Sequence, residues 1–335
     1  MGVTVGVIGL GRIGAFHTDT LSTLAGVDGL VVTDERAAVT ESVASKYGAK
    51  AVDSAAALIA AGVDGVVVAA ATPAHASLVL ACIDAGVPVF CEKPIAATPG
   101  ESLAVVQGIE SSDVQVQIGY NRRFAPAFAA AKKVVSSGDL GWLHTVRSTT
   151  LDPAPPPMDY IAVSGGIFRD CSVHDFDIVR WIVGHEVTEV YAAGSNQGDP
   201  KFTEYGDVDT ATTTLTFENG TIGVVSNTRY NARGYDCRLE VHGSEDSVVA
   251  GWDQQVPVRN LEEGAQFPNG TPHSFFMDRF ASAYQVELGA FIDVIAGKIE
   301  SPCTASDALE VAYIAEAATL SLQQHRPVRI DEVRL

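Results

Sequence analysis

A glycine-rich turn near the start of the chain constrains the fold most strongly. Residues 3–8 form a β-branched apolar run, and G-L-G-R-I-G follows directly at residues 9–14. Apolar side chains at Ile13, Phe16 and Leu21 then recur with the spacing of an amphipathic helix. A strand, a G-x-G-x-x-G turn and a helix in that order are typical of a dinucleotide-binding fold.

Each glycine of this turn has its own physical reason. The first permits a tight turn, the second lets the backbone approach a pyrophosphate, and the third lets the helix pack on the strand. The N-terminus of the helix adds N–H donors and the positive end of the helix dipole. The sequence therefore predicts a phosphate-binding segment made of Gly9, Gly11, Arg12, Ile13 and Gly14.

The end of the next strand indicates which dinucleotide binds. Residues 30–33 form this strand, and Asp34 follows it about twenty residues after the glycine turn. A carboxylate there accepts hydrogen bonds from the adenosine ribose and repels a 2′-phosphate, which predicts NAD. Arg36 leaves NADP open, because a nearby arginine can receive that phosphate; its alternative position is against the adenine ring.

Apolar strands and amphipathic helices alternate as far as residue 118, which predicts a parallel sheet covered by helices. We therefore expect an α/β Rossmann domain over residues 1–119. One of its strands closes with A-A-T-P at residues 70–73, so Thr72 and His75 are predicted to line the nicotinamide side. His75 equally fits a residue at a helix start whose imidazole is satisfied by the protein.

A short strand at residues 87–91 ends in Glu92, Lys93 and Pro94. Ligands of open parallel sheets bind beyond the carboxyl ends of the strands. We therefore expect Glu92 beside the cofactor and Lys93 at the floor of a cleft. A lysine at a strand end is, taken alone, more often an exposed side chain than a catalytic one.

The second domain, expected over residues 120–335, begins with N-R-R-F at residues 121–124. Its two arginines can bind a carboxylate or the cofactor phosphates, or can pair with acidic neighbours. A proline-rich loop starts at Asp152 and forms a stiff rim that cannot join a sheet interior. Asp152 either contacts substrate hydroxyls or caps the turn.

A helix predicted after the glycines at 165–166 carries the most informative chemistry. Asp170 and His174 are four residues apart, so they share one helix face. A histidine can take a hydroxyl proton as hydride leaves the carbon, and a carboxylate can orient its ring. Two alternatives are a divalent metal bound by Asp170, His174 and Asp177, and a buried His174 that is merely hydrogen-bonded. Asp177 and Arg180 are expected to form an ion pair on the helix surface.

Short strands with turn signals predict a mainly antiparallel sheet, with an Asn-Gly hairpin at residues 219–220. The predicted strands are 187–193, 210–217, 221–228, 236–242, 247–250 and 255–259. One face of such a sheet can cover the chain's own helices and the other needs a partner, so we expect a homo-oligomer. An amphipathic helix is predicted over residues 275–296 and an alanine-rich one over 305–324.

Composition excludes some classes of partner. The formal net charge of −19 argues against nucleic acid and anionic membranes, which require basic patches. No apolar stretch is long enough to span a membrane, and the first residues lack the basic region of a signal peptide. The five scattered cysteines have no C-x-x-C spacing and fit reduced thiols in the cytoplasm.

Taken together, the glycine turn with Asp34, the E-K-P segment and the Asp170/His174 helix resemble the glucose–fructose oxidoreductase / inositol dehydrogenase family. The resemblance extends over the whole chain. It implies that the Lys93–Pro94 bond is cis and that the sheet of the second domain forms dimer and tetramer contacts. The catalytic residues that it implies are Lys93, Asp170 and His174. The substrate-binding residues that it implies are Asn121, Arg122, Tyr235 and Tyr284, with Arg123 structural; Asp152 is expected to join them from its place at the start of the proline-rich loop.

The chain looks most like the myo-inositol 2-dehydrogenases of that family. The resemblance implies oxidation of a secondary ring hydroxyl of a cyclic polyol, giving 2-keto-myo-inositol (scyllo-inosose) and NADH. His174 would accept the hydroxyl proton, and Lys93 would hydrogen-bond the developing alkoxide. The alternatives are a scyllo-inositol, aldose or anhydro-sugar dehydrogenase, and a nucleotide sensor without turnover.

Overall fold

The computed structural model describes residues 2–335, which form two compact units. Unit 1 extends to Asn121 and also takes in Ser282–Glu310, whereas unit 2 consists of Arg122–Ala281 and Val311–Leu335. The division predicted from the sequence put residues 282–310 in the second domain. The structure differs at this segment because its apolar side chains complete the core of unit 1.

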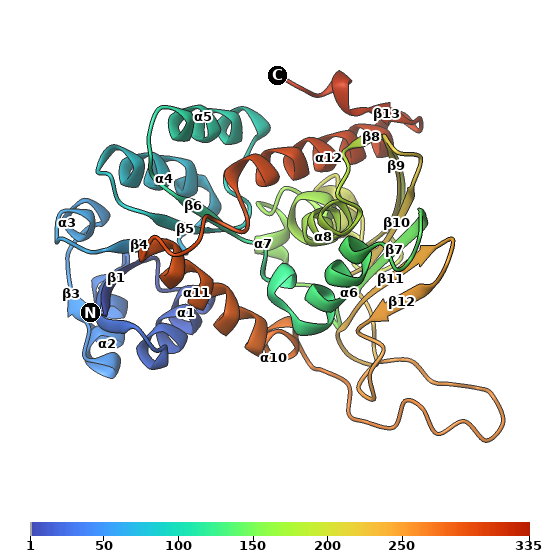
Figure 1. Cartoon of the computed structure of the whole chain (residues 1–335), viewed down its shortest axis with the longest axis horizontal. Helices are drawn as coiled ribbons and strands as arrows, with labels where there is room; N and C mark the ends of the chain where they lie inside the picture. The colour runs from blue at the N-terminus through green and yellow to red at the C-terminus, as the bar shows by residue number, and fades with distance from the viewer. Residues whose placement is uncertain (1) are drawn as a thin grey trace. The chain divides into compact units, whose positions relative to one another are not determined.

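Unit 1 contains a six-stranded parallel sheet in the order β3-β2-β1-β4-β5-β6, which is the Rossmann arrangement (Figure 1). The strands are β1 (Val3–Ile8), β2 (Val27–Thr33), β3 (Lys50–Ala51), β4 (Gly65–Val68), β5 (Val89–Glu92) and β6 (Val116–Gly119). The helices between them are α1 (Arg12–Thr23), α2 (Ala37–Tyr47), α3 (Ala55–Ile59), α4 (His75–Asp84) and α5 (Pro99–Glu110). Strands β4, β5 and β6 are buried at every residue, as expected of a sheet covered on both faces. The predicted α/β Rossmann fold is confirmed.

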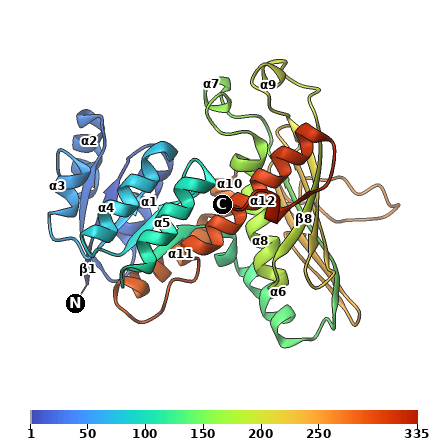
Figure 2. The same ribbon diagram turned by 90° about the horizontal axis from the view of Figure 1, so that it is seen from above.

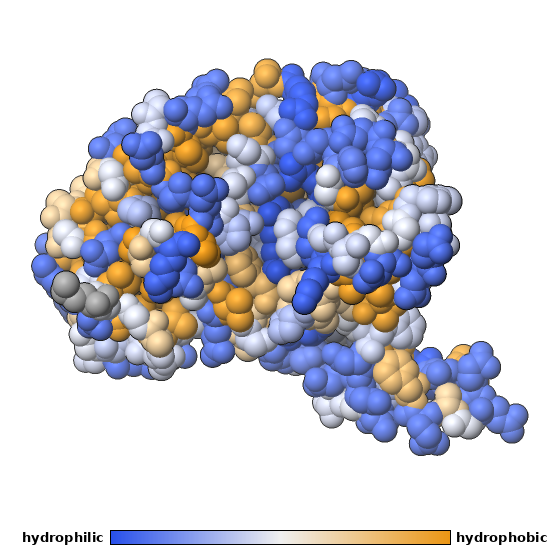
Figure 3. All heavy atoms as spheres, in the orientation of Figure 1, coloured by the Kyte–Doolittle hydropathy of each residue, from blue (hydrophilic) through white to orange (hydrophobic). Residues whose placement is uncertain are grey.

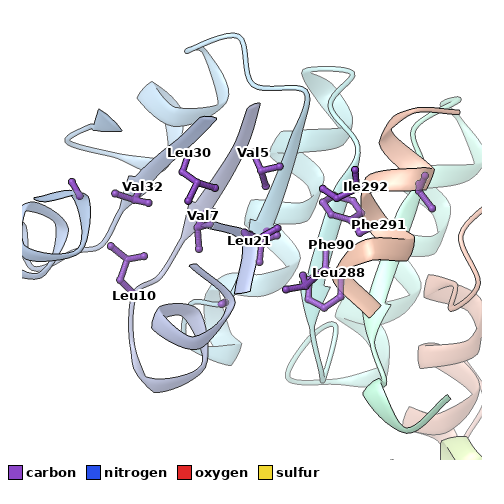
Figure 4. Packing of buried hydrophobic residues seen from close by; sticks show 14 residues of the cluster. Val5, Val7, Leu10, Leu21, Leu30, Val32, Phe90, Leu288, Phe291 and Ile292 are labelled. Atoms are coloured by element: carbon purple, nitrogen blue, oxygen red, sulfur yellow. The ribbon is translucent and has the colours of Figure 1, made fainter. Parts of the chain in front are cut away.

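Helix α11 (Ala281–Ile295) explains why the chain returns to unit 1. Its side chains Leu288 and Phe291 are fully buried in the same cluster as Phe90 of β5 (Figure 4). The Phe90 and Phe291 rings lie 5.9 Å apart between centroids. Burying large apolar side chains of this kind contributes about 1.5–3 kcal/mol each, so α11 is held where these rings meet.

Unit 2 contains a seven-stranded sheet in the order β12-β11-β7-β10-β9-β8-β13. The strands are β7 (Leu143–Leu151), β8 (Val187–Ser195), β9 (Thr210–Phe217), β10 (Ile222–Thr228), β11 (Asp236–Gly243), β12 (Ser247–Ala250) and β13 (Val328–Arg329). Among the described strand pairs of this sheet, only β7–β10 is parallel, which confirms a mainly antiparallel sheet. The predicted hairpin joins β9 to β10, and Gly220 has the positive φ of 85° that its turn requires.

Helices cover one face of this sheet and leave the other without a helix (Figure 2). The covering helices are α6 (Pro126–Ser137), α8 (Val173–Val183) and α12 (Ala305–Gln324). Every second residue of β9 is buried, which is the pattern of a sheet with one covered face. Short helices α7 (Met158–Ile161), α9 (Lys201–Glu204) and α10 (Phe276–Arg279) lie in the connections. Among residues 2–335, none of the helices has the length and apolar character needed to cross a membrane.

The segment between β12 and α10 differs from the prediction. A strand was expected at residues 255–259, but residues 251–275 contain no strand or helix, so that prediction was wrong. Pro257 has no backbone N–H for a sheet, and Gly251 leaves β12 with a φ of 86°. The segment projects from unit 2 with a mostly hydrophilic surface (Figure 3). The helix predicted over 275–296 is also divided, into α10 and α11 at Phe280.

All five cysteines are free and buried, which makes a testable prediction about their reactivity. Burial raises the pKa of Cys82 to about 12 and raises the pKa of Cys91 well above its usual value, because the thiolate is desolvated. Only the thiolate reacts rapidly with alkylating agents. We expect iodoacetamide to leave the native protein unmodified at mildly alkaline pH and to modify every cysteine in guanidinium. Mass spectrometry measures the difference, and rapid labelling of the native chain would contradict it.

Candidate active site

The carboxyl edge of the unit 1 sheet gathers the residues predicted from sequence. Gly9 follows β1, Asp34 follows β2, Thr72 lies beyond β4, Lys93 follows β5 and Asn121 lies beyond β6. Parallel strands all end at the same edge, so this edge carries every one of these positions. This is the edge at which sheets of this type bind their ligands.

The glycine turn fits a pyrophosphate. Gly9 has a φ of 88°, and a Cβ there would lie 2.5 Å from Ala70 Cα. A Cβ on Gly14 would lie 1.9 Å from the carbonyl oxygen of Gly9, so helix and strand pack too closely for any other residue. Gly11, by contrast, is exposed and a Cβ there would meet no atom within 4 Å. Open space therefore lies beside Gly11 and the first amides of α1, where a phosphate would bind.

Asp34 is held in place at the end of β2. Its Oδ2 accepts a hydrogen bond from the Leu10 amide (2.8 Å), and its Oδ1 accepts from the amide and the Nε of Arg36 (both 3.0 Å). Partial burial raises the pKa of Asp34, but the hydrogen bonds from Arg36 and Leu10 outweigh it and hold the pKa below its ordinary value. An ionised carboxylate thus stands beside the glycine turn, as binding of an adenosine ribose requires.

His75 belongs to the scaffold of this edge. The ring is 2% exposed, with Nδ1 2.7 Å from the carbonyl oxygen of Pro94 and Nε2 3.0 Å from that of Ala70. Both ring nitrogens thus lie within hydrogen-bonding distance of backbone carbonyl oxygens, which favours the alternative of an imidazole held by the protein at a helix start. Contact of Thr72 and His75 with a nicotinamide ring stays a prediction. The Lys93–Pro94 peptide bond is cis, as the family resemblance implied.

In unit 2, Asp170 precedes α8 in a π-helical turn that spans Phe168–Ser172. Single π turns inside helices are frequent at functional sites. Asp170 Oδ2 accepts a hydrogen bond from Arg229 Nη2 (2.6 Å), and its Oδ1 accepts from the Tyr160 hydroxyl (2.8 Å). His174 lies half-buried in the first turn of α8. The carboxylate predicted to assist His174 is thus oriented by two donors.

Arg229 is a residue that the sequence analysis missed. It follows β10, is 3% exposed, and bridges the two carboxylates of Asp170 and Asp152, the latter at 3.0 Å. Burial lowers the pKa of Arg229, but the surrounding acidic groups raise it above its ordinary value. Burial has the opposite effect on a carboxyl group and raises the pKa of Asp152, and the nearby Arg229 guanidinium offsets this rise only in part. No local pattern marks Arg229, because its partners are far away in the sequence.

The Arg229→Ala substitution is expected to destabilise unit 2 strongly. Removing the guanidinium leaves two largely buried carboxylates without their shared cation, and breaking a buried pair typically costs about 3–5 kcal/mol. Urea unfolding followed by circular dichroism measures the free-energy change. Arg233→Ala is the matched control, because Arg233 is an exposed arginine in the same connection. A loss no larger than that of the control would contradict the assigned role.

Two further arginines of unit 2 form buried ion pairs with α8. Arg122 donates to Asp175 (2.8 Å), whose carboxylate also accepts from Ser148, Thr150 and Asn227. Arg123 donates to Asp177 Oδ2 at 2.9 Å, as its predicted structural role requires.

The expectation that Asp177 lies on the helix surface was wrong. Asp177 is fully buried, and Arg180 pairs with Glu186 at 2.6 Å. The reason is that α8 packs this face on the N-R-R-F segment instead of exposing it. Within residues 2–335, no group of three or more His, Cys, Asp or Glu side chains is placed to hold a metal ion.

The predicted substrate residues are mostly buried. In unit 1, Asn121 is 3% exposed and Tyr284 is 5% exposed, with the Tyr284 ring 5.7 Å from that of His17. In unit 2, Arg122 is 2% exposed and Tyr235 is 4% exposed. Burial raises the pKa of Tyr235 well above its usual value, so its hydroxyl stays protonated. Their contact with a substrate stays a prediction.

Comparisons with known proteins agree with this arrangement. Residues 3–120 match the oxidoreductase family with an NAD-binding Rossmann fold, and residues 128–249 match the GFO/IDH/MocA C-terminal domain. The chain is 38% identical over 332 residues to myo-inositol 2-dehydrogenase of Thermotoga maritima, covering 98% of this chain and 99% of the relative.

Two solved structures are also similar. A myo-inositol dehydrogenase from Corynebacterium glutamicum has a TM-score of 0.90 and 32% identity, covering 98% of this chain and 99% of the other. The complex of a Lactobacillus casei myo-inositol dehydrogenase with NAD(H) and myo-inositol has a TM-score of 0.84 and 26% identity, with 98% and 97% coverage.

The fold and the comparisons define an NAD-dependent oxidoreductase that acts on a CH–OH group. The chain belongs to the GFO/IDH/MocA family, which confirms the resemblance found in its motifs.

Proposed function

We propose that this enzyme oxidises myo-inositol to 2-keto-myo-inositol (scyllo-inosose) and forms NADH. The observation that carries the proposal is the set of Lys93, Asp170 and His174 in a chain similar, over 98% of its length, to a myo-inositol 2-dehydrogenase. A sensor without turnover has no chemical reason to keep a lysine, a carboxylate and a histidine for proton transfer. The structure of each unit supports the roles assigned to its own residues.

His174 is the proposed general base, which accepts the proton of the substrate hydroxyl. Asp170 stabilises the resulting imidazolium, and Arg229 together with Tyr160 keeps that carboxylate fixed and in an accepting role. Lys93 donates a hydrogen bond to the oxygen on which negative charge develops, which lowers the barrier in a poorly solvated site. NAD supplies the hydride acceptor when it is bound.

The residues proposed to hold NAD lie on the carboxyl edge of unit 1. The glycine turn would take the pyrophosphate and Asp34 the adenosine ribose, because open space and an ionised carboxylate are found there. The remaining proposed contacts are Arg36, Thr72, His75 and Glu92. Substrate hydroxyls would be bound by Asn121, Arg122, Asp152, Tyr235 and Tyr284.

A substrate panel tests the proposal. NADH formation would be followed by absorbance with myo-inositol, scyllo-inositol, chiro-inositol, glucose and xylose, each with NAD and with NADP. We expect the highest kcat/KM for myo-inositol with NAD. Preference for scyllo-inositol or an aldose would replace the substrate assignment while keeping the chemistry. No turnover of any of these compounds, with NAD still bound, would contradict the proposed activity.

The helix-free face of the unit 2 sheet is the proposed contact with further copies of the chain. Tyr191 and Val249 are 44% and 53% exposed and carry apolar surface on that sheet. Light scattering after gel filtration measures the mass of the particle, and a dimer or tetramer is expected. Five free cysteines also favour a reducing compartment, which we propose to be the cytoplasm.

A further inference from the structure

We propose that His17, acting through Glu92, is a positioning residue that fixes the backbone of Lys93. The inference rests on the proposed function, because it assigns Lys93 a role in catalysis. All residues that carry it lie within unit 1. Neither the glycine motif nor the E-K-P segment by itself suggests a link between α1 and the end of β5.

The contact is a buried polar pair between two elements far apart in the sequence. His17 of α1 is 0% exposed and Glu92 of β5 is 9% exposed. His17 Nε2 lies 2.6 Å from Glu92 Oε1. The imidazole is surrounded by the rings of Phe16, Phe90 and Tyr284, with centroids 5.6–6.2 Å away. A polar pair in such an apolar environment is costly unless its hydrogen bonds are made.

The hydrogen bonds assign the proton of this pair. Glu92 Oε2 accepts from the Lys93 backbone amide at 3.2 Å, and a carboxylate can accept through Oε1 as well. His17 therefore donates through Nε2–H. Its Nδ1 is buried with no hydrogen-bond partner in the structure, which fits a lone pair better than a second N–H. The chain of contacts runs from His17 through Glu92 to the amide of Lys93.

The backbone next to Glu92 leaves space for its carboxylate. Gly119, which pairs with Glu92 across β5 and β6, has no side chain, and a Cβ there would lie 3.0 Å from Glu92 Oε2. On the other side of Lys93, the carbonyl oxygen of Pro94 lies 2.7 Å from His75 Nδ1. The backbone is thus held both before and after Lys93.

This arrangement has a consequence for the rate. Displacing a catalytic group by about 1 Å can lower turnover by about 10²-fold. Without a donor at position 17, Glu92 would keep one buried oxygen unpaired and would shift toward water or toward another donor. The amide of Lys93 would move with it, although no atom of His17 takes part in the reaction.

Three variants test the proposal in the full-length enzyme. His17→Phe fills the aromatic site without a donor, whereas His17→Gln keeps an N–H that can reach Glu92. Glu92→Gln keeps the shape of the acceptor but turns an NH₂ group or a neutral oxygen toward the Lys93 amide. Thr20→Val is the matched control, since it removes another hydrogen-bonding side chain from α1 away from Glu92.

We expect His17→Phe and Glu92→Gln each to lower kcat about 10- to 100-fold. His17→Gln should recover most of that loss, and the double variant His17→Phe/Glu92→Gln should be no worse than Glu92→Gln alone, because the two residues act as one unit. In His17→Phe, which alters no residue proposed to contact the cofactor, the dissociation constant of NAD, measured by fluorescence titration, should change less than about threefold. In nitrogen-15 NMR of the apo protein, His17 should show a protonated Nε2.

Four results would overturn the inference. The first is a kcat of His17→Phe within twofold of the parent, and the second is an equal loss of kcat in His17→Phe and His17→Gln. The third is a double variant whose loss of kcat is the product of the two single losses. The fourth is a His17 ring that carries its proton at Nδ1. The NMR result and NAD affinity do not depend on substrate. An inactive parent enzyme would count against the proposed function, whereas an active parent with these variant results would count against the role of His17.

Discussion

The His174→Ala enzyme is expected to lose turnover by about 10²–10⁴-fold, which is the contribution of a positioned general base. Binding of NAD should change little, because the substitution alters none of the residues proposed to hold the cofactor. Steady-state kinetics with myo-inositol measures the loss, and fluorescence titration measures NAD affinity.

Two controls separate chemistry from folding. His144→Ala removes an exposed histidine from β7 of the same unit and should leave kcat unchanged. The unfolding midpoint of His174→Ala should stay close to that of the parent, since His174 lies at the half-buried start of α8. Turnover of His174→Ala at the parent's rate would rule out the proposed base.

The Asp34→Ser enzyme is expected to lose about 10- to 100-fold in kcat/KM for NAD. Hydrogen bonds to a charged group contribute about 1.5–3 kcal/mol, and the ribose contacts of Asp34 are of this kind. The same change removes the negative charge that repels a 2′-phosphate and releases Arg36 from its 3.0 Å contact with Asp34. Activity with NADP should therefore rise relative to activity with NAD.

Kinetics with both cofactors test this prediction. Asp53→Ser is the control, because Asp53 is an exposed carboxylate next to β3 in the same unit. The ratio of kcat/KM values for NAD and NADP should fall in Asp34→Ser and stay constant in the control. An unchanged ratio in Asp34→Ser would show that the carboxylate does not select the cofactor.

Local signals were sufficient to predict much of this molecule. The glycine turn, Asp34 and the apolar strands of unit 1 carry short-range patterns, and each leads to the observed element. The Asn-Gly hairpin between β9 and β10 is likewise fixed by turn chemistry. These features depend on residues close together in the chain, so one amino-acid sequence is sufficient to identify them.

Contacts between distant segments could not be predicted in this way. Arg229 meets Asp170 across 59 positions, and His17 meets Glu92 across 75. The return of α11 to the core of unit 1 depends on Leu288 and Phe291 packing with Phe90. The spacing of apolar residues within α11 does not show which strand they pack against. The strand expected at 255–259 failed because β-branched residues alone do not supply a neighbouring strand to pair with.

Hydride transfer from C2 of myo-inositol to NAD is tested most directly with myo-inositol deuterated at C2. The purified enzyme would be incubated with this compound and NAD, and the masses of the cofactor and the ketone measured. We expect deuterium in NADH and a ketone that carries no deuterium. Unlabelled NADH, or no NADH at all from an enzyme that binds NAD, would contradict this expectation.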